Sequence, residues 1–107
     1  MEYSIFVGCD GLYNFTFEWD KSKNDINIEK HNISFNEAVT VFTDENAVFI
    51  ADVDHSDAEE RFIILGMSHK PRLLVVCHCY RESDTVIKII SARKANRHEC
   101  KTYGGVS

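Results

Sequence analysis

Three residues able to contact a phosphate group lie in the second half of the chain, each on a segment predicted to be a β-strand. Arg61 opens the segment RFIILGM, His78 lies within RLLVVCHCY, and Lys88 lies within TVIKIISA. Short turns between the segments predict two hairpins, in which His78 pairs with both Lys88 and Arg61, and Tyr80 follows at the same end of that face. Adjacent positive charges on a sheet repel each other, so this row predicts a bound anion.

An acidic segment offers a second interpretation of the same row. Residues 52–60 read DVDHSDAEE, and Glu59 and Glu60 directly precede Arg61. These carboxylates would neutralise the row without any bound anion. A register shift of one residue would also place the three side chains on different faces, because side chains alternate along a strand.

More basic residues follow the last of these strands. Arg93, Arg97 and Lys101 recur every four residues, so a helix over residues 93–103 would carry them as one stripe, with Lys94 beside its start. Residues 61–107 hold nine Lys or Arg and three acids, whereas residues 1–60 hold 14 acids and three lysines. This asymmetry indicates a surface for a polyanion, although a solvated basic stripe has the same composition.

The sequence predicts no metal site and no cofactor. Its four cysteines include no C-x-x-C pair, and Cys77 and Cys79 share one face of a predicted strand, so we expect thiols rather than a zinc site. Asp52, Asp54 and Ser56 are spaced like the start of a calcium loop, but Asp57 stands where that loop requires glycine.

The elements that must position these residues predict one α+β domain with a small, mostly antiparallel sheet, two N-terminal helices and a C-terminal helix. Asp20 is a candidate N-cap for the first helix, and Ser34 with Glu37 forms a candidate capping box for the second. We expect Ile26 and its neighbours to form the apolar face of the first helix. The predicted strands are 15–19, 47–51, 61–67, 72–80 and 85–92, and the helices are 21–30, 34–43 and 93–103.

The remaining segments and the core follow from the same pattern. We expect residues 1–14 to form an extra strand or a loose extension, residues 15–103 to form the domain, and residues 104–107 to fray. The hairpin register predicts a core face for the N-terminal helices made of Leu73, Val75, Cys77, Cys79, Ile87 and Ile89. No apolar stretch approaches the ~20 residues of a membrane span, and no signal peptide is recognisable, so we expect a cytoplasmic protein.

Several of these segments also resemble a known family. The segments FEWDKSKNDINIEKHNISFNEAVTVF, DVDHSDAEERFIILGMS and IKIISARKANRHE occur in the order and spacing of the BrnT toxins of bacterial type II toxin–antitoxin systems. The resemblance runs from Phe15 to Tyr103. It implies a RelE-like ribonuclease fold, an RNA substrate and inhibition of translation. It also implies neutralisation by a BrnA-type ribbon-helix-helix antitoxin, with operator DNA bound only through that antitoxin.

The family pattern matches this chain at positions that include the residues singled out above. The matches are Lys30-His31, Asp54-His55-Ser56, Glu59-Glu60-Arg61, Gly66, His78, Arg81 and Ser91-Ala92-Arg93-Lys94-Ala95. Relatives often carry an acid at position 80, where this chain has Tyr80. Tyr80 must replace that acid in proton transfer, or activity is reduced.

Metal-independent RNA cleavage uses the ribose 2′-hydroxyl as the nucleophile, so the protein must orient the RNA, move protons and stabilise the phosphorane. We assign Arg61, Arg81 and Arg93 to the phosphate charge and His78 to acid–base catalysis, with Tyr80 as a further catalytic candidate. For His78, a sheet-surface histidine without a catalytic role is an equally good interpretation, and for His31 the favoured interpretation is a cap at the C-terminal end of the first helix. The candidates for RNA binding are Lys88, Lys94, Arg97, Lys30 and His31. The alternative function is a catalytically weak component that binds nucleic acid or the antitoxin in operon autorepression.

Overall fold

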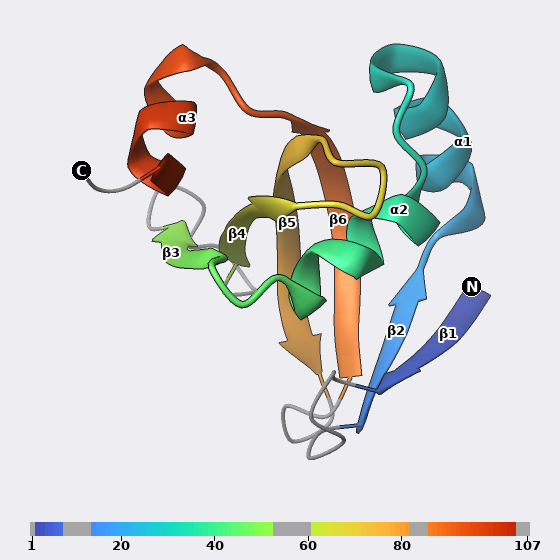
Figure 1. Cartoon of the computed structure of the whole chain (residues 1–107). Coiled ribbons are helices and arrows are strands. Elements are labelled where there is room, and N and C mark those ends of the chain that lie inside the picture. Colours follow the sequence, from blue (N-terminus) through green and yellow to red (C-terminus); the bar gives the residue numbers. More distant parts are fainter. Residues whose placement is uncertain (1, 8–13, 53–60, 82–85, 105–107) are drawn as a thin grey trace.

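The computed structural model describes residues 2–7, 14–52, 61–81 and 86–104, which form an α+β fold around one sheet (Figure 1). The sheet has six strands in the order β1-β2-β6-β5-β4-β3. All neighbouring strands are antiparallel except β2 and β6, which are parallel. The strands are β1 (Glu2–Val7), β2 (Asn14–Trp19), β3 (Val48–Asp52), β4 (Arg61–Met67), β5 (Leu73–Arg81) and β6 (Val86–Lys94). The predicted fold class is confirmed, and β1 is the extra strand anticipated within residues 1–14.

Two helices and a 3-10 turn link β2 to β3. They are α1 (Lys21–His31), α2 (Phe35–Thr40) and η1 (Val41–Thr43). The Asp20 side chain accepts a hydrogen bond from the Ser22 amide and caps α1, and the Ser34 hydroxyl accepts one from the Glu37 amide and caps α2, as predicted. Asn32 ends α1 in the left-handed conformation, with φ of 59°.

Polar contacts attach α1 to the sheet, whereas the sequence predicted an apolar face. Ile26 is 53% exposed, so that prediction is wrong. Asn27 is buried instead, and its amide donates to the carbonyls of Ala92 at 2.8 Å and Ile33 at 2.9 Å. It also accepts from the Ala92 amide at 3.1 Å. One side chain therefore satisfies both backbone groups of Ala92 in β6, which fixes the position of α1.

The main core lies between the sheet and the segment from Ile33 to Phe42. We call this side of the sheet the inner face and the opposite side the outer face. The inner face carries buried apolar residues from every strand from β2 to β4 in sheet order: Phe17, Trp19, Ile87, Ile89, Ala92, Leu74, Val76 and Ile64. Burial of these side chains supplies most of the driving force for folding.

The register of the central strands differs by one residue from the prediction. Leu65 pairs with Val75 rather than Leu74, and His78 pairs with Phe62 and Ile89 rather than Arg61 and Lys88. A bulge at Cys77/His78 shifts the β5–β6 pairing further along the strands. The inner face of β5 consequently carries Leu74, Val76, His78 and Tyr80. The prediction that Leu73, Val75, Cys77 and Cys79 face the helices is wrong, whereas Ile87 and Ile89 were placed correctly.

The C-terminal helix begins later than predicted. Strand β6 continues to Lys94, and α3 (Arg97–Gly104) follows, so Arg93 lies on the strand and the predicted stripe over Arg93, Arg97 and Lys101 does not form. Asn96 and Glu99 cap α3 reciprocally: each side chain accepts from the other residue's amide at 2.8 Å. At the other end, the Tyr103 hydroxyl donates to Asp44 at 2.7 Å and attaches α3 next to η1.

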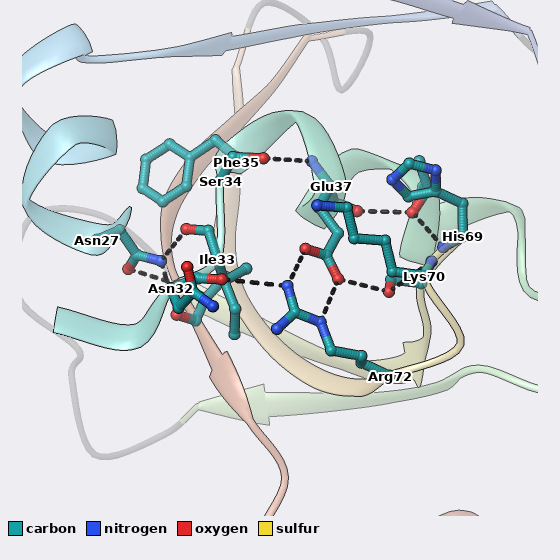
Figure 2. A network of polar contacts seen from close by, with 12 residues as sticks. Asn27, Asn32, Ile33, Ser34, Phe35, Glu37, His69, Lys70 and Arg72 are labelled. Atoms are coloured by element: carbon teal, nitrogen blue, oxygen red, sulfur yellow. Dashed lines mark hydrogen bonds and ion pairs between the residues drawn. The ribbon is translucent and has the colours of Figure 1, made fainter. Parts of the chain in front are cut away.

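A buried ion pair connects α2 to the turn between β4 and β5 (Figure 2). The Glu37 carboxylate accepts hydrogen bonds from the Arg72 guanidinium, with Nε at 3.0 Å, and from the Ser68 hydroxyl at 2.7 Å. Arg72 also donates to the Asn32 carbonyl at 3.1 Å. Burial raises the pKa of Glu37, but these hydrogen bonds and the charge of Arg72 outweigh burial and hold the pKa below its ordinary value.

Candidate functional site

His78 lies inside the protein rather than on its surface. Its side chain has no exposed area, and it packs among the rings of Phe42, at 4.9 Å between centroids, Tyr80, at 5.4 Å, and Phe62, at 6.3 Å. Nδ1 lies 3.3 Å from the Val76 carbonyl, and Nε2 has no hydrogen-bond partner among the described residues. Burial lowers the pKa of His78 to about 4. The imidazole is thus neutral at pH 7 and has no access to a ligand in this conformation.

Arg61 and Lys88, the other two members of the predicted row, lie on the outer face. Arg61 alternates with the inner-face residue Phe62, and Lys88 alternates with Ile87 and Ile89. Cys79 of β5 lies between them in the row, since it pairs with Lys88 and adjoins His78. The backbones of Arg61 and Lys88 are therefore two strand spacings apart, roughly 10 Å. A phosphate group bridges such a distance easily when long basic side chains extend towards it.

Arg81 and Glu18 extend this outer row. Arg81 lies two residues beyond Cys79 on the same face of β5, and its Nε is 3.6 Å from the Glu18 carboxylate. Glu18 pairs in register with Lys88 across the parallel β2–β6 contact. We call Glu18, Arg61, Arg81 and Lys88 the outer-face cluster. Four different strands, β2, β4, β5 and β6, contribute one residue each.

Arg93 lies apart from this cluster. It is on the outer face of β6, but five residues from Lys88, roughly 16 Å along the strand. Its guanidinium donates two hydrogen bonds to the Glu99 carboxylate, at 2.9 and 2.8 Å. The hydrogen bonds that Arg93 donates to Glu99 raise the pKa of Arg93 and lower the pKa of Glu99. The structure thus places Arg93 in an ion pair that stabilises the start of α3.

The other predicted residues are distributed over the molecule. Tyr80 is on the inner face, where the centroid of its ring lies 5.4 Å from that of Phe62 and the side chain packs against the core. Lys94 pairs with Leu74 and is therefore on the inner-face side, at the end of β6. The remaining three residues are exposed and lie on two different helices: Lys30 and His31 in the last turn of α1, and Arg97 in the first turn of α3. None of these five belongs to the outer-face cluster.

Sequence reasoning overlooked Glu18 as a site residue. The alternation in FTFEW correctly indicates that Glu18 faces away from Phe17 and Trp19. Its neighbours Lys88 and Arg81 could not be identified from that pattern, because the parallel pairing of β2 with β6 joins segments about 70 residues apart in the chain.

The described residues contain neither a metal-binding group of side chains nor a membrane-spanning helix. No group of three or more His, Cys, Asp or Glu side chains within residues 16–50, 61–81 and 86–103 is arranged to hold a metal ion. Within the described part of the chain, no helix has both the length and the apolar character to cross a membrane. Of the predicted acidic segment 52–60, Asp52 ends β3, and residues 53–60, with Asp54, Ser56, Glu59 and Glu60, lie outside the described residues.

Residues 19–99 match the sequence model of a family described as the ribonuclease toxin, BrnT, of type II toxin–antitoxin systems. The chain belongs to the BrnT family. A BrnT toxin has an antitoxin partner and an RNA target, and the predicted resemblance is confirmed. Among curated protein sequences, none is significantly similar to this chain.

A solved structure supports the same fold. The 1.1 Å crystal structure of the Brucella abortus ribonuclease toxin BrnT superimposes with a TM-score of 0.57 at 20% sequence identity. The alignment covers 76% of this chain and 96% of the Brucella protein. At this identity the likeness establishes the fold of this BrnT-family chain, whereas its chemistry has to be argued from its own residues.

Proposed function

We propose that this BrnT-family protein is an endoribonuclease toxin whose RNA-binding surface is the outer-face cluster. The observation that carries the proposal is that Arg61, Arg81 and Lys88 lie on one face of three adjacent strands. With three cations and one carboxylate, Glu18, the outer-face cluster has a net positive charge that favours a bound anion. The phosphodiester backbone of RNA supplies that anion.

The proposed reaction needs no metal ion. The 2′-oxygen attacks the adjacent phosphorus, the bond from phosphorus to the 5′-oxygen breaks, and the products end in a 2′,3′-cyclic phosphate and a 5′-hydroxyl. Arg61 and Arg81 bind the non-bridging oxygens and stabilise the extra charge of the phosphorane. The Lys88 ammonium donates a proton to the departing 5′-oxygen. This assignment replaces His78 with Lys88 as the proton donor.

Membership of the BrnT family supports the proposed biological role. The toxin acts in the cytoplasm, cleaves RNA and thereby inhibits translation, and a BrnA-type ribbon-helix-helix antitoxin neutralises it. Operator DNA is bound through the antitoxin alone. Co-expression with the product of a short neighbouring reading frame, followed by purification of a complex, tests the partner directly. If that product carries no ribbon-helix-helix pattern and forms no complex, the BrnA assignment is wrong.

Digestion of RNA by the purified protein tests the activity. The wild type is incubated with a fluorescently labelled RNA in the presence of EDTA, and the new ends are analysed for cyclic phosphate. Arg61→Ala and Arg81→Ala should each reduce cleavage by about 100-fold or more, as expected for groups that stabilise transition-state charge. Lys23→Ala removes an exposed positive charge from α1 and should cleave like the wild type. Intact RNA at high concentrations of antitoxin-free wild type contradicts the proposal.

A second function is favoured by two inner-face residues. Tyr80 occupies the position where relatives often carry an acid, and both Tyr80 and His78 are packed into the aromatic core. If no residue of this chain transfers protons to or from RNA, the protein would bind nucleic acid or the antitoxin without cleaving RNA, and would act in operon autorepression. Expression of the toxin alone distinguishes the two: arrested growth, relieved by Arg61→Ala, supports the ribonuclease, and normal growth supports the binding component.

A further inference from the structure

Three of the four members of the outer-face cluster, Arg61, Arg81 and Lys88, cannot accept the proton of the attacking 2′-hydroxyl. A guanidinium and an ammonium group have hydrogen-bond donors and no acceptor atom. His78, the acceptor expected from the sequence, is buried on the other side of the sheet. A ribonuclease working at this surface therefore needs a proton acceptor among the remaining outer-face side chains.

Glu18 has the position required of such an acceptor. Its side chain points to the outer face, since Phe17 and Trp19 on either side of it are buried in the inner core. It is nevertheless only 8% exposed, which is unusual for a carboxylate on a sheet surface away from the main core. Its carboxylate lies 3.6 Å from Arg81, and its backbone is in register with Lys88. Glu18 thus lies beside a cation that would bind the phosphate, Arg81, and in register with the proposed proton donor, Lys88.

We propose that Glu18 is the general base of the reaction, a role that rests on the ribonuclease function proposed above. In this step the 2′-hydroxyl proton passes to a Glu18 carboxylate oxygen while the 2′-oxygen forms its bond to phosphorus. The phosphorus–O5′ bond breaks, and Lys88 supplies the proton that the 5′-oxygen takes up. Both side chains then return to their starting states by proton exchange with water. Arg81 binds the phosphate and orients the Glu18 carboxylate.

A purely structural ion pair is the competing explanation, because cross-strand Arg–Glu pairs also occur on sheets without any chemistry. The two explanations differ in what Glu18→Gln does. Glutamine keeps the size of the side chain and can still accept a hydrogen bond from Arg81, but it cannot take up the proton. A general base is worth about 10²–10⁴-fold in rate. A structural pair would affect thermal stability and leave the chemical step intact.

The experiment measures single-turnover cleavage of a short RNA by the wild type, Glu18→Gln and Glu99→Gln. Glu99→Gln is the matched control, since it makes the same change in the Arg93–Glu99 pair on this face. We expect Glu18→Gln to cleave at least about 100-fold more slowly and to lose the acidic limb of the pH–rate profile. Its affinity for a 2′-O-methyl RNA and its melting temperature should stay close to those of the wild type. Cleavage within about threefold of the wild type overturns the assignment.

A substrate with sulfur in place of the bridging 5′-oxygen separates the two proton transfers. A thiolate leaves without being protonated, so this substrate should restore cleavage to Lys88→Met but not to Glu18→Gln. Restoration in Glu18→Gln would show that Glu18 acts on the leaving group and would overturn its role as the base. If Glu18→Gln does not fold, Glu18→Asp takes its place: it should keep the acidic limb while cleaving about tenfold more slowly. An unchanged rate in that variant overturns the assignment. A wild type inactive on every RNA refutes the ribonuclease function itself.

Discussion

Glu37 and Arg72 form an ion pair whose carboxylate side chain is 1% exposed and whose guanidinium side chain is 23% exposed. The pair joins α2 to the segment between β4 and β5, two parts of the chain 35 residues apart. Ser68 contributes a further hydrogen bond to the same carboxylate. The position of α2 against the sheet thus depends on a charge that is almost entirely removed from water.

Removal of Arg72 should destabilise the protein strongly. In Arg72→Leu the Glu37 carboxylate stays buried without its charged partner, and we expect a loss of about 3 kcal/mol in the free energy of unfolding. Chemical denaturation measures this value. The control is Asp25→Ala, which breaks the exposed Lys21–Asp25 pair on α1 and should cost no more than about 0.5 kcal/mol. Equal losses in the two variants would show that burial of Glu37 is not what makes its pair important.

Arg61 should contribute one ionic contact to RNA. We expect Arg61→Gln to weaken binding of a 2′-O-methyl RNA and to reduce the slope of log K against log salt concentration by about 0.7, the value for one phosphate contact on a single strand. Fluorescence anisotropy over a series of salt concentrations gives the slope. Lys23→Gln removes a charge from α1 and should leave it unchanged. An unaltered slope in Arg61→Gln would place RNA binding elsewhere.

His78 should make the stability of the protein sensitive to acid. The folded state keeps the imidazole neutral down to a pKa of about 4, whereas the unfolded chain binds a proton near pH 6.5. Unfolding therefore takes up a proton between these pH values, and stability falls as the pH decreases through this window. The loss attributable to His78 reaches about 3 kcal/mol at and below pH 4.

The variant His78→Phe isolates this contribution, because phenylalanine fits the aromatic surroundings of Phe42, Phe62 and Tyr80 and does not titrate. As the pH falls from 6.5 to 4, the free energy of unfolding of the variant should increase relative to that of the wild type. RNA cleavage by the variant should persist at pH 7. A loss of cleavage in a well-folded His78→Phe protein would restore His78 to the active site.

Gly66 should tolerate no side chain. A Cβ at this position would lie 2.9 Å from Val41 Cγ1 and 3.1 Å from the Ala47 Cβ, closer than packed carbon atoms approach each other. We expect Gly66→Ala to lower the free energy of unfolding by about 1–3 kcal/mol through displacement of η1 from β4. Combination with Val41→Ala should recover part of this loss, since the two sites are in contact. Additive losses in the double variant would contradict a clash with Val41.

The local signals in the sequence were sufficient for most elements. Asp20 and Ser34 cap α1 and α2 as predicted, because capping depends on residues two or three positions away in the chain. The boundary between β6 and α3 was placed four residues early. The spacing of Arg93, Arg97 and Lys101 indicated a helix there, whereas the pairing of β6 with β5 continues through Lys94, and Asn96 and Glu99 provide the actual cap.

The candidate site was predicted only in part. Arg61, Arg81 and Lys88 were all selected from the sequence, and they do share the outer face. Glu18 was not selected, because its relation to Arg81 depends on the β2–β6 contact. Arg93 was selected for its charge, but in the folded protein its guanidinium forms an ion pair with Glu99.

By itself, the sequence determined the family, the α+β class and the elements, since these depend on periodicity, caps and motif order along the chain. Only the tertiary structure decided that His78 lies on the face opposite to Lys88. The segment LLVVCHCY is apolar on both sides, so its alternation does not indicate which side meets the core. The strand register and the bulge at Cys77/His78 determine which side chains face the core. A shift of one residue in the register places a side chain on the opposite face of the sheet.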